Sequence, residues 1–215
     1  MAIKVTVQLV VFAIRDSALQ VLLAKRQGKT LKNGMGIPGT LLHQGESFED
    51  AAKRTLKSSV GADEIHLEQL HCSVNARRNG GGGRGFSVAY FALLPADKAR
   101  AMSSTSWRGL RNLSTLGSTQ QRIVDHAVRR LRKRVEHNTA GFRLLARKFT
   151  LPELQQMYEA ILDRDLDKRN FRKKMSSLGV LRALPEWRRT GRKPARLYTV
   201  AASRLEKLEH KEIAL

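Results

Sequence analysis

The sequence predicts a two-part α/β protein, with a strand-rich first half and a smaller, mainly helical second half that ends in a pair of strands. Three observations support this prediction. The first hundred residues contain four apolar runs typical of strands and one capped helix. Apolar residues then recur at helical spacing over about 118–137, and from Phe149 two short helices precede two strand-like runs. We therefore expect one domain at 1–145, including a linker helix at about 118–137, and a second at 149–215.

The first two apolar runs, VTVQLVVFAI and LQVLLAKR, predict a β-hairpin, because the short segment Arg15 to Ala18 separates them. A glycine-rich loop is expected from Gly28 to Gly45. Within it, Pro38 favours an extended conformation in the residue before it.

A helix is expected next, because Ser47 and Asp50 have the spacing of a capping box. It should continue through about Ser59 and end at Gly61. Two more strands, HLEQLHCSV and GFSVAYFALLP, flank a loop that contains four consecutive glycines.

The net charge of +21 from 40 basic and 19 acidic side chains predicts a polyanionic partner, of which nucleic acid is the commonest. Residues 1–100 carry 14 basic and 8 acidic side chains, a net +6, and residues 101–215 carry 26 and 11, a net +15. The polyanion is therefore expected to bind mainly to the second half. The sequence contains no long apolar run, so membrane insertion is not expected. The single cysteine, Cys72, excludes an intramolecular disulfide and fits a reducing cytoplasm.

In the second half, Thr150 has the spacing of an N-cap with Glu153 and predicts a first helix. Asp167 opens a basic second helix, KRNFRKKMSSL, which Gly179 ends. Two strand-like runs, VLRALPEW and RLYTVA, flank a basic turn. Helix, turn, basic helix and basic hairpin follow one another in the order of a winged helix-turn-helix domain.

Two basic segments are the candidate DNA contacts. Phe171 and Met175 anchor one side of the second helix, which leaves its basic residues on outward or flanking faces. Asn170 fits a bidentate contact with adenine, and equally a helix cap or a turn. Basic residues of the hairpin would follow the backbone or enter the minor groove. The candidates are Thr150, Lys168, Arg169, Asn170, Arg172, Lys173, Arg188, Arg189, Arg192, Lys193 and Arg196.

The run PGTLLHQGESFEDAAKRTLKSSVGA resembles the Nudix box of diphosphate hydrolases, which implies an α/β/α sandwich for the first domain. Glu46, Arg54, Leu56 and Gly61 fall in register with its pattern. The other motif positions differ: Thr40 replaces the first glycine, and Thr55, Ser58 and Ser59 replace three glutamates.

These replacements predict the loss of ordinary Nudix hydrolysis. Nudix enzymes place carboxylates on one helix so that Mg²⁺ or Mn²⁺ ions bridge protein and pyrophosphate. Serine hydroxyls are weak ligands for such ions, so we expect no catalytic residues and no metal site. Glu46 and Arg54 are either ligand-binding residues or a structural ion pair that braces the loop on its helix.

A Nudix domain without this chemistry can still bind a nucleotide diphosphate through backbone N–H groups and guanidinium groups. An aromatic ring, that of Phe86 or Tyr90, is placed to stack on an adenine. The same arginines also fit solvated loop charges. The candidate ligand-binding residues are Arg26, Glu46, Arg54, Arg77, Arg84 and Phe86.

Further runs resemble a narrower family, the Nudix-related transcriptional regulators of bacterial NAD metabolism. These runs include FTLPELQ, YEAIL, LDKRNFRKK and GRKPARLY, and the resemblance covers nearly the whole chain. It implies a homodimeric, cytoplasmic, nucleoid-associated repressor that binds a palindromic operator in duplex DNA. It also implies ADP-ribose as effector, with no cofactor required. The loop from Arg77 to Gly85 lacks the Asp and Pro that the family usually has there.

Two other functions remain open at this point. One is an active Nudix hydrolase with an appended nucleic-acid-binding domain, for which Glu49, Asp50 and Glu68 are the nearby acids. The other is an RNA-binding processing factor, since basic winged helices also bind RNA. For the repressor, we expect the linker helix to transmit ligand binding to the winged helices of a dimer.

Overall fold

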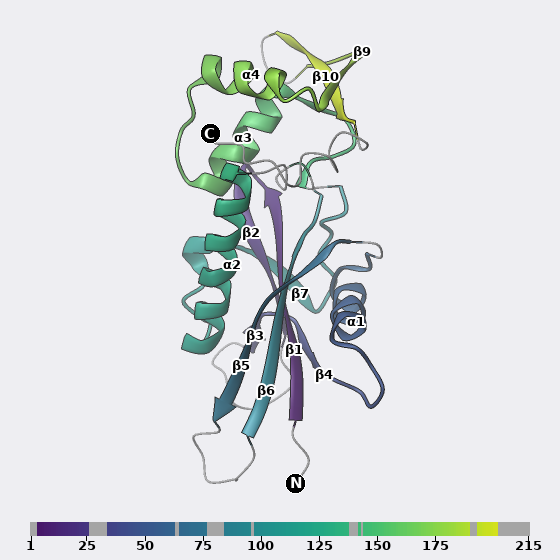
Figure 1. Ribbon diagram of the computed structural model, residues 1–215, viewed down its shortest axis with the longest axis vertical. Coiled ribbons are helices and arrows are strands. Elements are labelled where there is room, and N and C mark those ends of the chain that lie inside the picture. Colours follow the sequence, from purple (N-terminus) through teal and green to yellow (C-terminus); the bar gives the residue numbers. More distant parts are fainter. Residues whose placement is uncertain are drawn as a thin grey trace. The chain divides into compact units, whose positions relative to one another are not determined.

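Figure 1 shows the computed structural model of the chain, which describes residues 4–25, 34–62, 65–76, 84–95, 97–137, 142, 144–189 and 193–201. The chain forms two compact units. The first comprises Met1–Ala13 and Gln20–Val128, and the second comprises Ile14–Leu19 and Arg129–Leu215. The helix α2 (Ser118–His137) begins in the first unit and ends in the second.

Seven described strands form one mixed sheet in the first unit. Its main path runs in the order β3-β2-β1-β6-β5, while β4 pairs with β1 and β7 pairs with β2. β1 is central, since it runs parallel to β6 and antiparallel to β4. The strands are β1 (Lys4–Arg15), β2 (Ala18–Lys25), β3 (Met35–Gly36), β4 (Gly39–Leu41), β5 (Leu67–Ala76), β6 (Arg84–Leu93) and β7 (Thr105–Gly109).

The turn between β1 and β2 is the predicted hairpin. Asp16 and Ser17 both have positive φ angles, of 50° and 58°. Two consecutive residues in this region are typical of a two-residue turn whose twist matches that of the flanking strands. Short polar side chains tolerate the left-handed region better than β-branched ones, so the sequence suits the turn.

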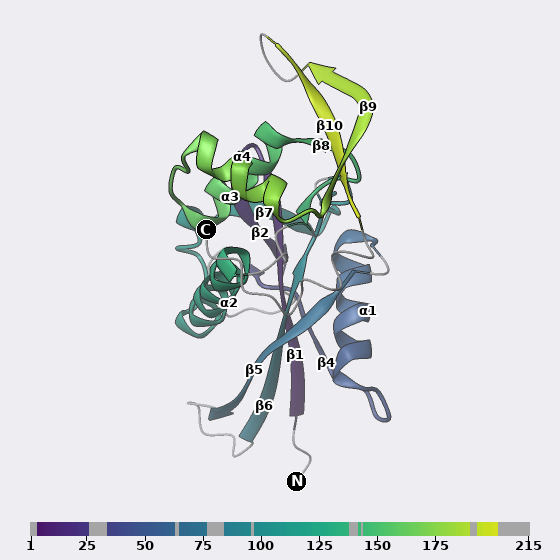
Figure 2. The ribbon, with the colours of Figure 1, turned by 45° about the horizontal axis from the view of Figure 1, so that its top comes forward.

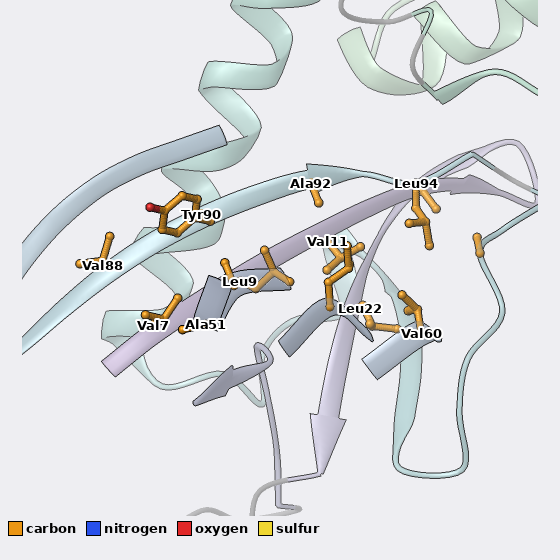
Figure 3. Close-up of a cluster of buried hydrophobic side chains, with 14 residues drawn as sticks. Val7, Leu9, Val11, Leu22, Ala51, Val60, Val88, Tyr90, Ala92 and Leu94 are labelled. Atoms are coloured by element: carbon orange, nitrogen blue, oxygen red, sulfur yellow. The ribbon is translucent and has the colours of Figure 1, made fainter. Parts of the chain in front are cut away.

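The helix α1 (Phe48–Val60) begins and ends where the sequence predicted. The Ser47 hydroxyl accepts a hydrogen bond from the Asp50 N–H, and Gly61 follows with φ 67°. Its buried residues Ala51, Leu56 and Val60 belong to a core cluster that includes side chains of β1 and β6 (Figure 3). This burial fixes α1 on one side of the sheet.

The first half of α2 covers the other side of the same sheet (Figures 1 and 2). The predicted apolar stripe is confirmed, since each of its members is buried: Ile123, Val124, Ala127, Val128, Leu131 and Val135. With α1 on the opposite side, the first unit is the α/β/α sandwich that the Nudix resemblance implied. Over the described ranges, no helix combines the length and the apolar character needed to cross a membrane.

Three strands in the first unit were not predicted. β3 and β4 lie within the expected glycine-rich loop, and β7 lies in a segment without an assigned structure. β3 and β4 have two and three residues, which is too short to show an alternating pattern. β7 reads TSWRG, and its pairing with β2 from Gln20 to Ala24 defines it as a strand.

The second unit has the predicted order of a winged helix-turn-helix. Its described elements after α2 are β8 (Phe149–Thr150), α3 (Leu151–Leu162), α4 (Lys168–Ser177), β9 (Leu181–Arg189) and β10 (Pro194–Val200), and the sheet order is β8-β10-β9. Tyr158 is in the centre of the core, with its ring 5.4 Å from that of Phe171 and 6.4 Å from that of Phe142. These contacts hold α4 on α3.

Thr150 begins α3 through a complete capping box. Its hydroxyl accepts a hydrogen bond from the Glu153 N–H at 3.3 Å, and its own N–H donates to Glu153 Oε2 at 2.7 Å. The Thr150 side chain is fully buried. Thr150 is one of the candidate DNA contacts, but its side chain is a structural cap of α3 and, unlike the described candidates of α4, is not exposed.

Thr150→Val should lower the free energy of unfolding of the second unit by about 0.5–2 kcal/mol, because it removes the cap acceptor and keeps the side-chain volume. Hydrogen exchange of the α3 amides in the full chain measures this change. Thr150→Ser, which keeps the oxygen, is the control and should lose less. Equal exchange rates in wild type and Thr150→Val would contradict the assigned role.

Candidate functional site

A cleft of about 670 Å³ opens beside α1 and is the candidate ligand site of the first unit. Five segments contribute to it: β1, the end of β2, the segment from Ile37 to Leu41, α1, and the residues at the start of β7. Most of its polar side chains carry hydroxyl groups. The lining residues are Thr6, Gln8, Ala24, Lys25, Ile37, Pro38, Gly39, Thr40, Leu41, Arg54, Thr55, Ser58, Ser59, Ser104 and Thr105.

Arg54 lines this cleft and makes hydrogen bonds to several surrounding segments. Its Nε and Nη2 atoms donate to the two carboxylate oxygens of Glu46, each at 2.8 Å. Nη1 donates to the Thr40 hydroxyl at 2.8 Å, and Nη2 also donates to the Leu41 carbonyl at 3.1 Å. One guanidinium group therefore ties the loop, β4 and α1 together. This geometry is the structural brace that the sequence allowed as one of two interpretations.

Glu46 is held in its charged form. Hydrogen bonds from Arg54 and from the His43 N–H, the latter at 3.0 Å, lower the pKa of Glu46 from 4.5 to about 2. The same contact raises the pKa of Arg54. Glu46 is not among the cleft-lining residues, whereas Arg54 is.

Hydroxyl groups occupy the positions where the Nudix pattern has glutamates. The hydroxyls of Thr55, Ser58 and Ser59 each donate to a carbonyl one turn back in α1, at 2.7, 3.0 and 2.7 Å. Thr55 and Ser59 are buried. In the described part of the chain, no three His, Cys, Asp or Glu side chains gather so that they could hold a metal ion. These residues do not fit the divalent metal cluster of the Nudix fold.

The other predicted ligand-binding residues have different placements. Arg26 and Arg77 lie outside the described residues, as does the side chain of Arg84, the first residue of β6. Phe86 is half-buried, packs against the core cluster and does not line the cleft. Tyr90 is buried and donates from its hydroxyl to Gln69 at 3.2 Å, and burial raises its pKa.

Of the residues that line the cleft, the sequence predicted only Arg54 as a ligand-binding residue. Gln8, Lys25, Ser104 and Thr105 are among those that it did not predict. The Lys25 N–H donates to the Ser104 carbonyl at 2.8 Å, which brings the end of β2 to the start of β7. Thr105 donates to the Ser59 carbonyl at 3.2 Å, across 46 residues of sequence. No local pattern signals a contact of this separation. Lys25 could have been found as the cation next to Arg26.

The basic helix α4 is oriented as predicted. The Asp167 side chain caps it by accepting from the Asn170 N–H at 2.8 Å, so Asn170 lies in the first turn with an exposed side chain. Phe171 and Met175 are buried. The opposite surface is exposed and carries the candidate DNA contacts Lys168, Arg169, Asn170, Arg172 and Lys173.

The predicted basic residues of the hairpin are also exposed. Arg189, Lys193 and Arg196 lie on the surface of β9, the turn and β10, and Arg192 lies outside the described residues. The Arg196 Nε donates to the Leu184 carbonyl at 2.9 Å, so the Arg196 side chain lies across the hairpin toward β9. The second unit therefore presents cations from both α4 and the hairpin.

Acidification should weaken the Arg54 brace selectively. Because the folded-state pKa of Glu46 is about 2 and its ordinary value is 4.5, the ion pair stabilises the fold above pH 4.5 and loses this effect as the pH falls toward 2. The difference in melting temperature between wild type and Glu46→Gln should therefore be largest near neutral pH and shrink below pH 4.5. A difference that does not change with pH would contradict the geometry.

Comparison with known proteins gave matches over both units. The model of the NUDIX domain family matches residues 5–107, and that of the NrtR DNA-binding winged helix domain matches residues 141–200. The chain is 30% identical over 206 residues to the ADPR responsive transcriptional repressor NtrR of Acinetobacter baylyi, which covers 91% of this chain and 81% of that protein.

Two solved structures resemble the chain at low sequence identity. The crystal structure of Shewanella oneidensis NrtR complexed with a 27mer DNA has a TM-score of 0.83 and 25% identity, covering 97% of this chain and 99% of that one. The NUDIX domain of Shewanella oneidensis NrtR complexed with ADP ribose has a TM-score of 0.52 and 26% identity, covering 61% and 90%. The chain belongs to the NrtR family of transcriptional regulators, which join a NUDIX domain to an NrtR-type winged helix.

Proposed function

We propose that this chain is a DNA-binding transcriptional repressor of NAD biosynthesis or salvage genes, and that ADP-ribose in the Nudix cleft regulates it. The observation that carries the proposal is α4, whose buried anchors Phe171 and Met175 turn a row of cations to the surface. Relatives named as a repressor and solved with DNA and with ADP-ribose support it. Such a protein acts in the bacterial cytoplasm, on the nucleoid.

DNA binding follows from the chemistry of the exposed surface. Arginine donates two parallel hydrogen bonds to guanine edges, and asparagine does so to adenine. Arg169, Asn170 and Arg172 provide these groups on the helix that enters the major groove in helix-turn-helix proteins. Lys168 and Lys173 are placed for phosphates. As a homodimer, the protein would place two such helices on a palindromic operator.

ADP-ribose suits the cleft in size and in chemistry. A volume of about 670 Å³ lies within the usual range for small-molecule sites. Lys25 and Arg54 supply positive charge for the diphosphate, and the surrounding hydroxyls can donate or accept hydrogen bonds with the riboses. A diphosphate bound in this way needs no metal ion, and no other cofactor is required.

We infer that the cleft does not hydrolyse its ligand in the way of Nudix enzymes. Thr55, Ser58 and Ser59 have no charge with which to hold Mg²⁺. Two of the three nearby acids have other partners: Glu49 forms an ion pair with Lys53 at 2.8 Å, and Asp50 accepts from the Ser47 hydroxyl at 2.6 Å.

The long helix α2 is the element through which the two functions would be coupled. In the first unit, His126 of α2 contacts His71 of β5, with ring centroids 5.2 Å apart. In the second unit, Arg132 donates to the Ile161 carbonyl at 2.8 Å, and Glu136 pairs with Arg164 at 3.1 Å. A displacement of α2 on ligand binding would therefore also displace α3. In a dimer, this movement would change the separation of the two recognition helices.

The full chain should bind duplex DNA from its own gene neighbourhood at physiological salt, and ADP-ribose should release it, with EDTA present throughout. Fluorescence anisotropy measures binding, and chromatography of the nucleotide afterwards should recover ADP-ribose intact. A scrambled duplex and a structured RNA are the competitors. Equal binding to all three nucleic acids, or cleavage of ADP-ribose on addition of Mg²⁺, would contradict the proposal.

Arg172→Ala should weaken specific DNA binding by about 1–3 kcal/mol, because Arg172 is an exposed side chain of α4 that can reach a base edge. Arg108→Ala is the matched control, since Arg108 is an exposed arginine of β7 in the first unit and its loss removes the same charge. Anisotropy with the specific and scrambled duplexes distinguishes the variants. Equal losses for both would show that only net charge matters.

A further inference from the structure

The hairpin β9–β10 exposes a tryptophan among cations. Trp187 is 63% exposed and lies directly opposite Arg196 in the strand register. Opposed residues of antiparallel strands share a face, and so do residues two apart on one strand. Trp187 and Arg196 therefore lie on the same face as Arg189 and its partner Pro194. We call this surface the outer wing face.

The neighbouring side chains of β9 face the other way and fasten the hairpin. Arg188 donates to Glu153 at 3.1 Å and to the Lys148 carbonyl at 3.3 Å. Glu186 pairs with the Lys148 ammonium group at 2.7 Å. Two ion pairs thus hold one face of β9 against the segment that leads into α3. These ion pairs determine which face of the hairpin is exposed. They also engage Glu186, the acidic side chain among the described residues of the hairpin.

Exposure of a single tryptophan is common in proteins and by itself indicates no function. The composition of the outer wing face is what distinguishes Trp187. Its neighbours there are the guanidinium groups of Arg189 and Arg196 and the rings of Pro185 and Pro194. At the centre of a protein interface, by contrast, lysines and acids are depleted and large apolar residues are enriched. The other large hydrophobic residues that the structure shows as exposed, Leu41, Phe48, Val74 and Met102, all belong to the first unit.

We propose that Trp187 enters the minor groove of duplex DNA beside the segment bound by α4, while Arg189 and Arg196 contact the flanking phosphates. This inference rests on the DNA-binding function proposed above. The indole presents a flat apolar body and a single N–H donor. The minor-groove edges of A·T pairs offer only acceptors, whereas G·C pairs add the guanine amino donor. Trp187 should therefore favour A·T pairs at its position.

The shape of the second unit fits this role. Figure 2 shows β9 and β10 extending beyond α3 and α4, so the hairpin can reach DNA outside the segment that a recognition helix covers. Proteins that bind the minor groove commonly combine apolar side chains that enter it with arginine or lysine side chains that read it.

The test uses the full chain and a duplex that it selects from a random-sequence pool. Trp187→Ala should lower affinity about tenfold, and Trp187→Phe should recover part of the loss by keeping an aromatic ring. Val74→Ala, which truncates an equally exposed side chain in the first unit, should bind like wild type. The emission difference between wild type and Trp187→Phe reports Trp187 alone, and DNA should quench it.

Base substitution in the flank gives an independent readout. Replacing an A·T pair there by G·C should weaken wild type, and replacing that G·C by inosine·C, which lacks the amino group, should restore binding. Trp187→Ala should respond to neither change. Suppose that wild type binds the duplex, that its Trp187 emission does not change, and that Trp187→Ala binds with the same affinity. These results would overturn this inference alone. Loss of self-association in Trp187→Ala would instead assign Trp187 to a protein interface. Failure of wild type to select any duplex would overturn the proposed function itself.

Discussion

The first unit depends on one constraint: β1 is buried on both faces, so its backbone groups must find partners along both edges. On one edge β6 runs parallel to it from Lys4 to Phe12. On the other edge the partner changes, since β4 pairs with residues Thr6 to Gln8 and the sheet continues with β2. The Leu9 N–H bridges the change by donating to the Pro38 carbonyl at 2.8 Å. The cleft opens where the partners change, which is why β1, β2 and β4 all line it. The position of the candidate ligand site is thus a consequence of how the sheet completes its hydrogen bonds.

The replacement of Nudix carboxylates by hydroxyls preserves the scaffold. Thr55 and Ser59 donate back to carbonyls of their own helix, so they are buried without an unsatisfied hydroxyl proton. Arg54 and Glu46 keep the loop in place through a pair that is charged in the neutral range. Because the helix has hydroxyls instead of carboxylates at the cleft, it would not repel a diphosphate. No cation would be needed between the helix and the diphosphate. In the proposed function, the loss of metal chemistry and the binding of ADP-ribose would therefore follow from the same replacements.

The sequence predicted those parts of the molecule whose signals are local. Ser47 with Asp50, Thr150 with Glu153, and Asp167 all mark helix starts, because a cap is made within three residues. The orientation of α4 followed from the spacing of Phe171 and Met175. The cleft was predicted only in part, since Lys25, Ser104 and Thr105 meet α1 through pairing of β7 with β2. The burial of Thr150 was not predicted, because a cap motif does not reveal burial. Phe86 shows the same limit, since its place beside the core depends on the register of β6.

One carboxylate in the second unit serves two structures. Glu153 completes the capping box of α3 and also receives Arg188 from the hairpin. Helix initiation and wing attachment therefore depend on the same side chain. A glutamine at this position would keep an acceptor for the cap and lose the ion pair, and an aspartate would be one methylene shorter for both. Substitution at position 153 is accordingly expected to accompany changes at positions 150 and 188, so that in related chains these three positions would covary although the last lies 35 residues away.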